Sequence, residues 1–192
     1  KTFISVNLAS TIALSDKKVL LLGLDIRNPK LEEYLDVPKV GVTNYLASKE
    51  HKDSADFLTK VEGFSNFYVM PAGVIPPNPA ELLMGKKVGE LFEKLKQEFD
   101  YIIVDTAPVS LVTDTLLISK YADAFVYVTR ANYLDKRMLT LPEKLYQEKK
   151  LPNMSILIND TDSTKGYGYG YGYGYGYGVE VEKKSFWKRF LK

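Results

Sequence analysis

Lysine, threonine and aspartate side chains stand in this sequence where they could bind a phosphorylated ligand. Lys1-Thr2 comes directly before FISVNLASTIAL, in which Ile4, Leu8 and Ile12 have the spacing of one helix face. The dipeptide is how the phosphate-binding motif G-x-x-x-x-G-K-[ST] ends, in which the lysine reaches the β- and γ-phosphates and the hydroxyl ligates Mg²⁺. The amino terminus of a helix favours the same anion. We expect the glycines of this motif to lie before residue 1, which makes residues 1–192 a fragment of a longer protein.

Two apolar runs each lead to an aspartate. Val19 to Leu22 is followed by Asp25 and Arg27, and Tyr101 to Val104 is followed directly by Asp105. Short, continuous apolar runs predict strands that are covered on both faces of a parallel sheet. Because ligands bind at the carboxyl ends of such strands, the two runs predict a site at Asp25, Arg27 and Asp105. Asp105 stands directly after an apolar strand, which is the position of an acid that holds magnesium, usually through water. The alternative is that Asp105 only caps the next segment.

The elements that position these side chains alternate between strand and helix. Helices are predicted up to about Leu14, in short pieces within 30–48, from Pro79 onward, and over 88–99, 113–121 and 135–149. Asn78 is expected to cap the helix that begins at Pro79. Further strands are predicted over 67–70, 124–129 and 154–158, the last ending at Asn159. This alternation predicts an α/β fold with a mostly parallel sheet.

The composition excludes several classes of function. The chain has 192 residues, 45% hydrophobic and 26% charged, which is typical of one globular domain. It has no cysteine and a single histidine, His51, so disulfides, thiolate metal sites and histidine metal clusters are excluded. We expect His51 on the surface. A formal net charge of +2 gives no indication of nucleic acid binding. No apolar run approaches the roughly 20 residues of a transmembrane helix, so we expect this part of the protein to be cytoplasmic.

The globular domain is predicted to cover residues 1–165, and the C-terminal residues are of another kind. Residues 166–178 alternate strictly between glycine and tyrosine. Glycine at every second position makes ordering costly in backbone entropy, which favours an extended set of phosphoacceptors over an adhesive or β-forming segment. The acceptors are Tyr167, Tyr169, Tyr171, Tyr173, Tyr175 and Tyr177. Residues 179–192 form a basic amphipathic segment, which indicates an interfacial anchor or a docking segment.

LLLGLDIRNP, PPNPAELL, IIVDTAP and the tyrosine-rich C terminus together resemble the catalytic domain of the bacterial tyrosine kinases (BY-kinases). These are P-loop autokinases that control capsule and exopolysaccharide synthesis. The resemblance covers residues 1 to about 178. It implies a three-layer P-loop NTPase fold, with its N-terminal strand and glycine loop before Lys1, and it implies ATP and Mg²⁺ as cofactors.

The resemblance also implies roles for particular residues. Lys1 and Thr2 match the end of the first phosphate motif, Asp25 and Arg27 match the second motif, and Asp105 matches the third. The implied catalytic residues are Lys1, Asp25, Arg27 and Asp105, and the implied magnesium ligands are Thr2, Asp25 and Asp105. Asn159 matches an asparagine that hydrogen-bonds adenine in the wider class of deviant P-loop ATPases; on sequence alone an ordinary loop asparagine is the alternative.

Gly23 departs from the family pattern. The second motif usually reads D-x-D-x-R, and its first acid accepts the proton of the tyrosine, whereas here that position is glycine. The base role must then fall to Asp25 or be nearly dispensable. Phosphoryl transfer through a loose transition state depends mainly on positioning and charge neutralisation, and general-base help contributes about 10²–10⁴-fold. We therefore expect a slower kinase rather than an inactive one.

Partners follow from the same resemblance. Family members form ring-like homo-oligomers whose subunits phosphorylate one another's C termini. A transmembrane polysaccharide co-polymerase segment activates them at the inner face of the cell membrane, and a phosphotyrosine phosphatase is a further implied partner. An anionic membrane surface is a candidate contact for the basic C terminus. Two alternatives stay open on the sequence: an ATPase switch of the partition or positioning type, and a nucleotide-binding regulatory subunit in which Gly23 marks weakened catalysis.

Overall fold

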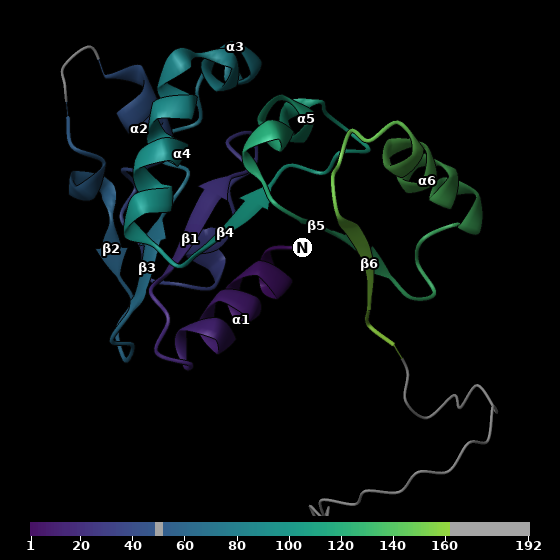
Figure 1. Cartoon of the computed structure of the whole chain (residues 1–192), viewed down its shortest axis with the longest axis horizontal. Coiled ribbons are helices and arrows are strands. Elements are labelled where there is room, and N and C mark those ends of the chain that lie inside the picture. The colour runs from purple at the N-terminus through teal and green to yellow at the C-terminus, as the bar shows by residue number, and fades with distance from the viewer. Residues whose placement is uncertain (49–51, 162–192) are drawn as a thin grey trace, which may run out of the picture. The chain divides into compact units, whose positions relative to one another are not determined.

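The computed structural model describes residues 1–48 and 52–161, which belong to one compact unit, Lys1–Thr161 (Figure 1). The predictions for His51 and for residues 162–192, including the tyrosines and the basic segment, lie outside the described residues. The elements are α1 (Thr2–Ala13), β1 (Val19–Leu24), η1 (Leu31–Glu33), α2 (Val42–Ala47), η2 (Ser54–Phe57), β2 (Thr59–Lys60), β3 (Phe67–Met70), α3 (Pro79–Met84), α4 (Lys86–Glu98), β4 (Tyr101–Thr106), α5 (Asp114–Ile118), η3 (Ser119–Tyr121), β5 (Phe125–Arg130), η4 (Lys136–Leu139), α6 (Thr140–Gln147) and β6 (Met154–Asn159).

The described strands form two sheets. A four-stranded sheet has the order β2-β3-β1-β4, and β5 pairs with β6. Every pair is parallel except β2 with β3. The predicted α/β fold with mostly parallel strands is confirmed. The sequence did not predict β2, because Thr59–Lys60 is too short to show a strand period.

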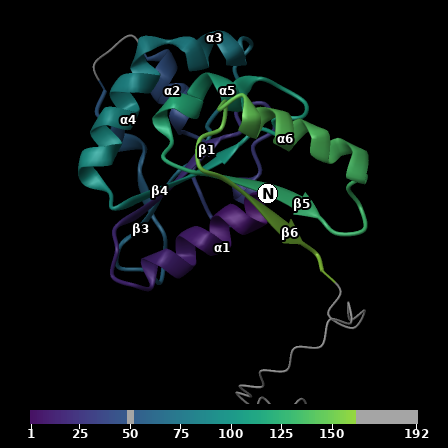
Figure 2. The same cartoon turned by 45° about the vertical axis from the view of Figure 1, so that its right-hand side comes forward.

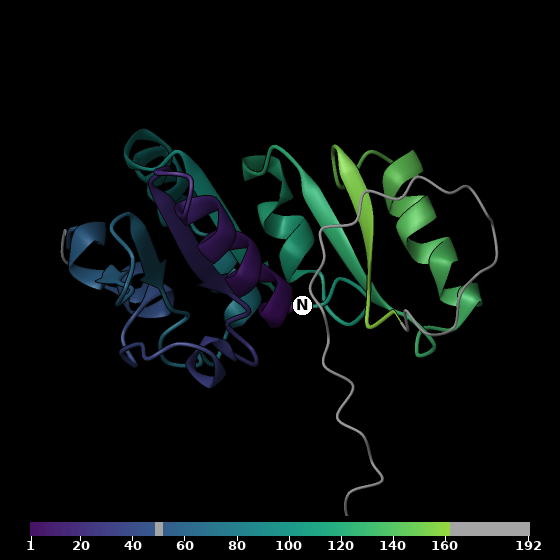
Figure 3. The same ribbon diagram turned by 90° about the horizontal axis from the view of Figure 1, so that it is seen from below.

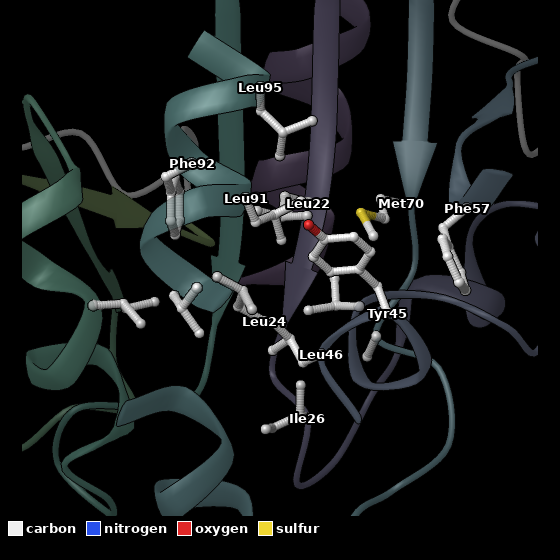
Figure 4. Close-up of a cluster of buried hydrophobic side chains, with 14 of the residues drawn as sticks. Leu22, Leu24, Ile26, Tyr45, Leu46, Phe57, Met70, Leu91, Phe92 and Leu95 are labelled. Carbon is white, nitrogen blue, oxygen red and sulfur yellow. The ribbon is translucent and has the colours of Figure 1, made fainter. Parts of the chain in front are cut away.

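β1 lies in the middle of the larger sheet and is buried along its whole length. Leu20, Leu22 and Leu24 pack into one cluster with α2 and α4, whereas Val19 and Leu21 pack into a second cluster with α1. Successive side chains point to opposite faces of a strand, so helices cover both faces and the apolar run is unbroken. Figure 4 shows the first cluster, in which Leu22 and Leu24 face the side chains of α4. Burial of each leucine contributes about 1.5–3 kcal/mol.

The predicted helix over 135–149 is divided into a 3₁₀ turn, η4, and a shorter α-helix, α6. The Asp135 side chain accepts a hydrogen bond from the Arg137 backbone N–H, which starts η4. The helix ends at Gln147, and Lys149 has a φ of +54°, which stops helical propagation.

The helix predicted from Pro79 is present, and Asn78 stands at its N-cap as predicted. Asn78 occupies the N-cap position without accepting a backbone hydrogen bond there. Instead, its side-chain amide donates to Glu81 Oε2 at 2.6 Å. Asn78 is therefore the N-cap residue that the sequence predicted, although its side chain bonds Glu81 rather than a backbone N–H of the helix.

β5 and β6 are much less covered than β1, although α6 lies beside them (Figures 2 and 3). Val126, Ile156 and Ile158 expose 49%, 52% and 61% of their surface. A groove of about 950 Å³ is lined by residues of β4 and β5 and by residues of α1, α4 and α5. Within residues 1–48 and 52–161, neither β4 nor β5 has a strand partner on the edge that lines this groove.

Candidate active site

The two strand ends that carry an aspartate are neighbours in the larger sheet. β1 and β4 pair in register, with Gly23 opposite Asp105. Because the strands are parallel, the segments that follow them leave the sheet at the same edge. α1 begins beside this edge, so that Lys1 and Thr2 reach Asp105 from more than 100 positions away in the sequence. Asp25 follows β1 at the same place.

Asp105 is the centre of a cluster of polar side chains. Its Oδ1 accepts a hydrogen bond from Lys1 Nζ at 2.8 Å, and its Oδ2 accepts one from Thr2 Oγ1 at 2.8 Å. Ser5 Oγ lies 3.4 Å from Oδ1 and was not predicted from the sequence. Lys1 Nζ also lies 3.3 Å from Asp25 Oδ2. One ammonium group therefore links the carboxylates at the ends of β1 and β4.

The two carboxylates are more deeply buried than the ammonium group between them. The side chains of Asp105, Asp25 and Lys1 are 1%, 10% and 31% exposed. A buried carboxylate is costly unless a cation or several donors accompany it. Asp25 also accepts a hydrogen bond from the Asn28 backbone N–H at 3.2 Å. The cluster is thus a site that requires positive charge, which Lys1 supplies in this structure.

The donor set of the cluster also suits magnesium. Thr2, Asp25 and Asp105 offer only oxygen ligands, and Mg²⁺ prefers one or two carboxylates completed by phosphate oxygens and water. The residues that the structure describes contain no group of three or more His, Cys, Asp or Glu that could form a dedicated metal cage. The residues therefore fit a magnesium ion shared with a phosphorylated ligand.

The structure gives a physical reason for glycine at position 23. A Cβ at this position would lie 2.8 Å from the Ala72 backbone nitrogen and 3.0 Å from Leu31 Cδ1. Real Cβ atoms do not approach backbone this closely, so the chain after β3 would have to move. This packing disfavours an acid at position 23, and Asp25 is the carboxylate that the second motif brings to the cluster.

Arg27 makes a two-point ion pair with Asp114, whereas Lys1 contacts the carboxylates of the cluster. Arg27 Nε donates to Asp114 Oδ2 at 2.6 Å, and Nη2 donates to Oδ1 at 3.0 Å. The Asp114 carboxylate raises the pKa of Arg27, mainly by accepting these hydrogen bonds. Asp114 was not predicted from the sequence, since in TDTLL it resembles any acid in the first turn of a helix.

Asn159 lies at the carboxyl end of β6, in the smaller sheet, opposite Arg130. None of the hydrogen bonds and ion pairs within the described part of the chain joins its side chain to Lys1, Asp25 or Asp105. The structure therefore brings Lys1, Thr2, Asp25 and Asp105 together and leaves Asn159 outside their cluster. The catalytic, metal-binding and adenine-binding roles of these residues stay predictions, as does the role of the tyrosines.

A lysine and a threonine at the start of a helix, bonded to acids at the ends of parallel strands, have the arrangement expected of a phosphate site of the P-loop ATPase class. The profile of the family described as "AAA domain" matches residues 1–139. The chain is 35% identical over 169 residues to the tyrosine-protein kinase ptk of Acinetobacter johnsonii, covering 87% of this chain and 23% of that protein. It is 32% identical over 164 residues to the tyrosine-protein kinase CpsD of Streptococcus pneumoniae, covering 84% of this chain and 71% of that protein. The chain therefore belongs to the bacterial tyrosine-protein kinase family, as its motifs predicted.

Solved structures agree with this assignment. The kinase domain of the Escherichia coli tyrosine kinase ETK matches with a TM-score of 0.77 and 30% identity, covering 90% of this chain and 67% of that one. The septum site-determining protein MinD of Pyrococcus horikoshii, complexed with Mg-ADP, matches with a TM-score of 0.61 and 21% identity, covering 81% of this chain and 62% of that one. This second likeness shows the fold alone. The chain spans only 23% of the Acinetobacter relative.

Among the described residues, no helix combines the length and the apolar character needed to cross a membrane.

Proposed function

We propose that this chain is the catalytic part of an ATP- and Mg²⁺-dependent protein-tyrosine autokinase that regulates capsule or exopolysaccharide synthesis. The observation that carries the proposal is the convergence of Lys1, Thr2 and Asp25 on or beside Asp105, with Lys1 Nζ 2.8 Å from Asp105 and 3.3 Å from Asp25. The relatives support the reaction type, because they are named as tyrosine-protein kinases.

Nucleotide binding would exchange one cation for another at the buried carboxylates. Lys1 would leave Asp25 and Asp105 and donate to the β- and γ-phosphates. The Thr2 hydroxyl and the two carboxylates would hold Mg²⁺, so that Asp105 never stays buried without a positive partner. Bound magnesium neutralises the charge that develops on the transferring group. Asn159 would hydrogen-bond the adenine.

Transfer itself would depend on few groups of the protein. The tyrosine oxygen forms a bond to the γ-phosphorus while the bond from that phosphorus to the ADP oxygen breaks. Asp25 would accept the phenolic proton, since position 23 has no side chain to do so. Arg27 follows Asp25 by two residues and would offer, at the same end of β1, the N–H donors that Asp114 does not engage. Such a site works mainly by positioning and charge neutralisation.

The acceptors in this proposal are the six tyrosines of residues 166–178. They would be phosphorylated by a neighbouring subunit in a ring-like homo-oligomer and cleared by a phosphotyrosine phosphatase. A transmembrane co-polymerase segment would hold the kinase at the cytoplasmic face of the membrane. The basic residues 179–192 would contact the anionic lipid surface there.

The test is to add Mg-ATP to the full-length protein and measure ADP release and protein mass together. A variant with all six tyrosines changed to Phe is the matched control. We expect several phosphoryl groups on the wild type and none on residues 166–178 of the control. ADP release without phosphotyrosine would contradict the proposal and indicate a positioning-type ATPase. ATP binding without either product would contradict it in favour of a regulatory subunit.

A further inference from the structure

A buried carboxylate outside the proposed phosphate cluster connects the two strand ends that form the site. Asp114 is the first residue of α5, and its side chain is 1% exposed. Its two oxygens accept from Nε and Nη2 of Arg27 at 2.6 and 3.0 Å. Bidentate arginine–carboxylate pairs fix orientation as well as distance. Asp114 therefore determines where the guanidinium of Arg27 lies.

The ion pair joins the segment after β1 to the segment after β4. Thr115, the next residue, donates its buried hydroxyl to the Ala107 carbonyl at 2.7 Å. Ala107 stands two residues beyond Asp105, and Arg27 stands two residues beyond Asp25. The contact thus ties together two segments that each carry one acid of the cluster.

Lys1 is the second connection between these segments, through its contacts at 3.3 Å with Asp25 and 2.8 Å with Asp105. In the proposed function Lys1 moves to the phosphates when the nucleotide binds, so its contacts with the two carboxylates are lost. Asp25 and Asp105 must nevertheless keep their spacing during the reaction. The pair of Arg27 and Asp114 involves no atom of Lys1. Its geometry therefore does not depend on where Lys1 lies.

We propose that Asp114 is a positioning residue for phosphoryl transfer, which holds Arg27 and the Asp25 segment in a fixed place relative to Asp105. This inference rests on the proposed function. Arg27 has five N–H donors, of which Asp114 engages two, and its side chain is 39% exposed. The remaining donors are free of Asp114 and available to an anionic ligand. A lysine at position 27 would keep the charge but not the two-point contact.

The test compares Asp114→Asn, Arg27→Lys and the double variant in the full-length protein. Autophosphorylation is followed as a function of ATP concentration, at a temperature where a thermal scan shows each protein to be folded. Each single variant is expected to lower the maximal rate about tenfold or more, because small displacements at a reacting site cost up to about 10²-fold. The KM for ATP should change less than the maximal rate. The double variant should be no slower than the slower single variant, since both changes break one contact.

Asp135→Asn is the matched control, because it removes a carboxylate paired with Arg137 at 2.6 Å on the surface, where the two side chains are 48% and 89% exposed. It should keep the wild-type rate. A folded Asp114→Asn protein with the wild-type maximal rate would overturn the inference, as would additive losses in the double variant. If Asp114→Asn does not fold, Arg27→Lys decides alone, and a wild-type maximal rate in that variant overturns the inference. A wild type that makes no phosphotyrosine is a separate result, which contradicts the proposed function and removes this inference with it.

Discussion

The two sheets differ in how well they are covered and in what they carry. β1 is buried at every position between α1 and the helices α2 and α4, and Asp25 and Asp105 lie at the carboxyl edge of its sheet. β5 and β6 expose Val126, Ile156 and Ile158, and their sheet carries Asn159. The residues proposed for phosphoryl transfer thus stand on the better-packed sheet. Positional precision at reacting groups requires such support.

Substitutions in the phosphate cluster, at the carboxyl edge of the larger sheet, should have the largest effect on autophosphorylation. Lys1→Met and Asp105→Asn in the full-length protein should each remove most phosphotyrosine, on the order of a 10²-fold loss or more, because each strips a charged partner from the triphosphate or its magnesium. Phosphotyrosine is measured by mass spectrometry after addition of Mg-ATP. Asp123→Asn, which changes a side chain that is 96% exposed, is the control. Wild-type labelling in the Asp105→Asn protein would place the chemistry elsewhere.

The next largest effect should be on the free energy of unfolding, which should fall more when a side chain of β1 is truncated than when one of β6 is. Leu22→Ala removes a fully buried side chain of β1 and should lower the free energy of unfolding by about 2–5 kcal/mol. Ile158→Ala removes a side chain that is 61% exposed and should cost less than about 0.5 kcal/mol. Urea denaturation of the two variants measures this difference. Equal losses would mean that β6 is as well covered as β1.

Position 23 tests how closely the larger sheet is packed at its active edge. Gly23→Asp would place a Cβ 2.8 Å from the Ala72 nitrogen, and overpacking of this kind costs about 1–3 kcal/mol. We expect a lower melting temperature and no gain in autophosphorylation, although the change restores the usual motif. Gly23→Ala should share the loss of stability, since the clash begins at Cβ. An aspartate variant that is as stable as the wild type and faster would refute this explanation of Gly23.

The smallest expected effect concerns the smaller sheet. Asn159→Ala should remove about one hydrogen bond to adenine, worth about 1 kcal/mol, and so raise the KM for ATP severalfold. The maximal rate should stay the same, because the phosphate cluster is intact. Asn66→Ala is the control, because Asn66 lies just before β3, at the amino-terminal ends of the parallel strands and away from the phosphate cluster. An unchanged KM in Asn159→Ala would remove Asn159 from the nucleotide site.

The sequence predicted β1, β4 and the polar side chains at their ends for a physical reason. β1 and β4 are continuous apolar runs followed by acids, and parallel strands bring such ends to one edge. The pair of Arg27 and Asp114 could not be predicted, because its partners are 87 positions apart and Asp114 stands in no distinctive local pattern. The sequence also did not predict that β4 and β5 belong to different sheets within the described residues. Strand order depends on tertiary contacts rather than on local periodicity.

Asp25 offers the most direct test of the account, since it would accept the tyrosine proton in the absence of an acid at position 23. The measurement is the rate of phosphotyrosine formation on residues 166–178 in the full-length protein with saturating Mg-ATP, for the wild type and for Asp25→Asn. We predict multiply phosphorylated wild type and a rate lower by about 10²-fold or more in Asp25→Asn, from lost base catalysis and lost magnesium support. An Asp25→Asn protein that labels its tyrosines at the wild-type rate, or a wild type that labels none, would contradict it.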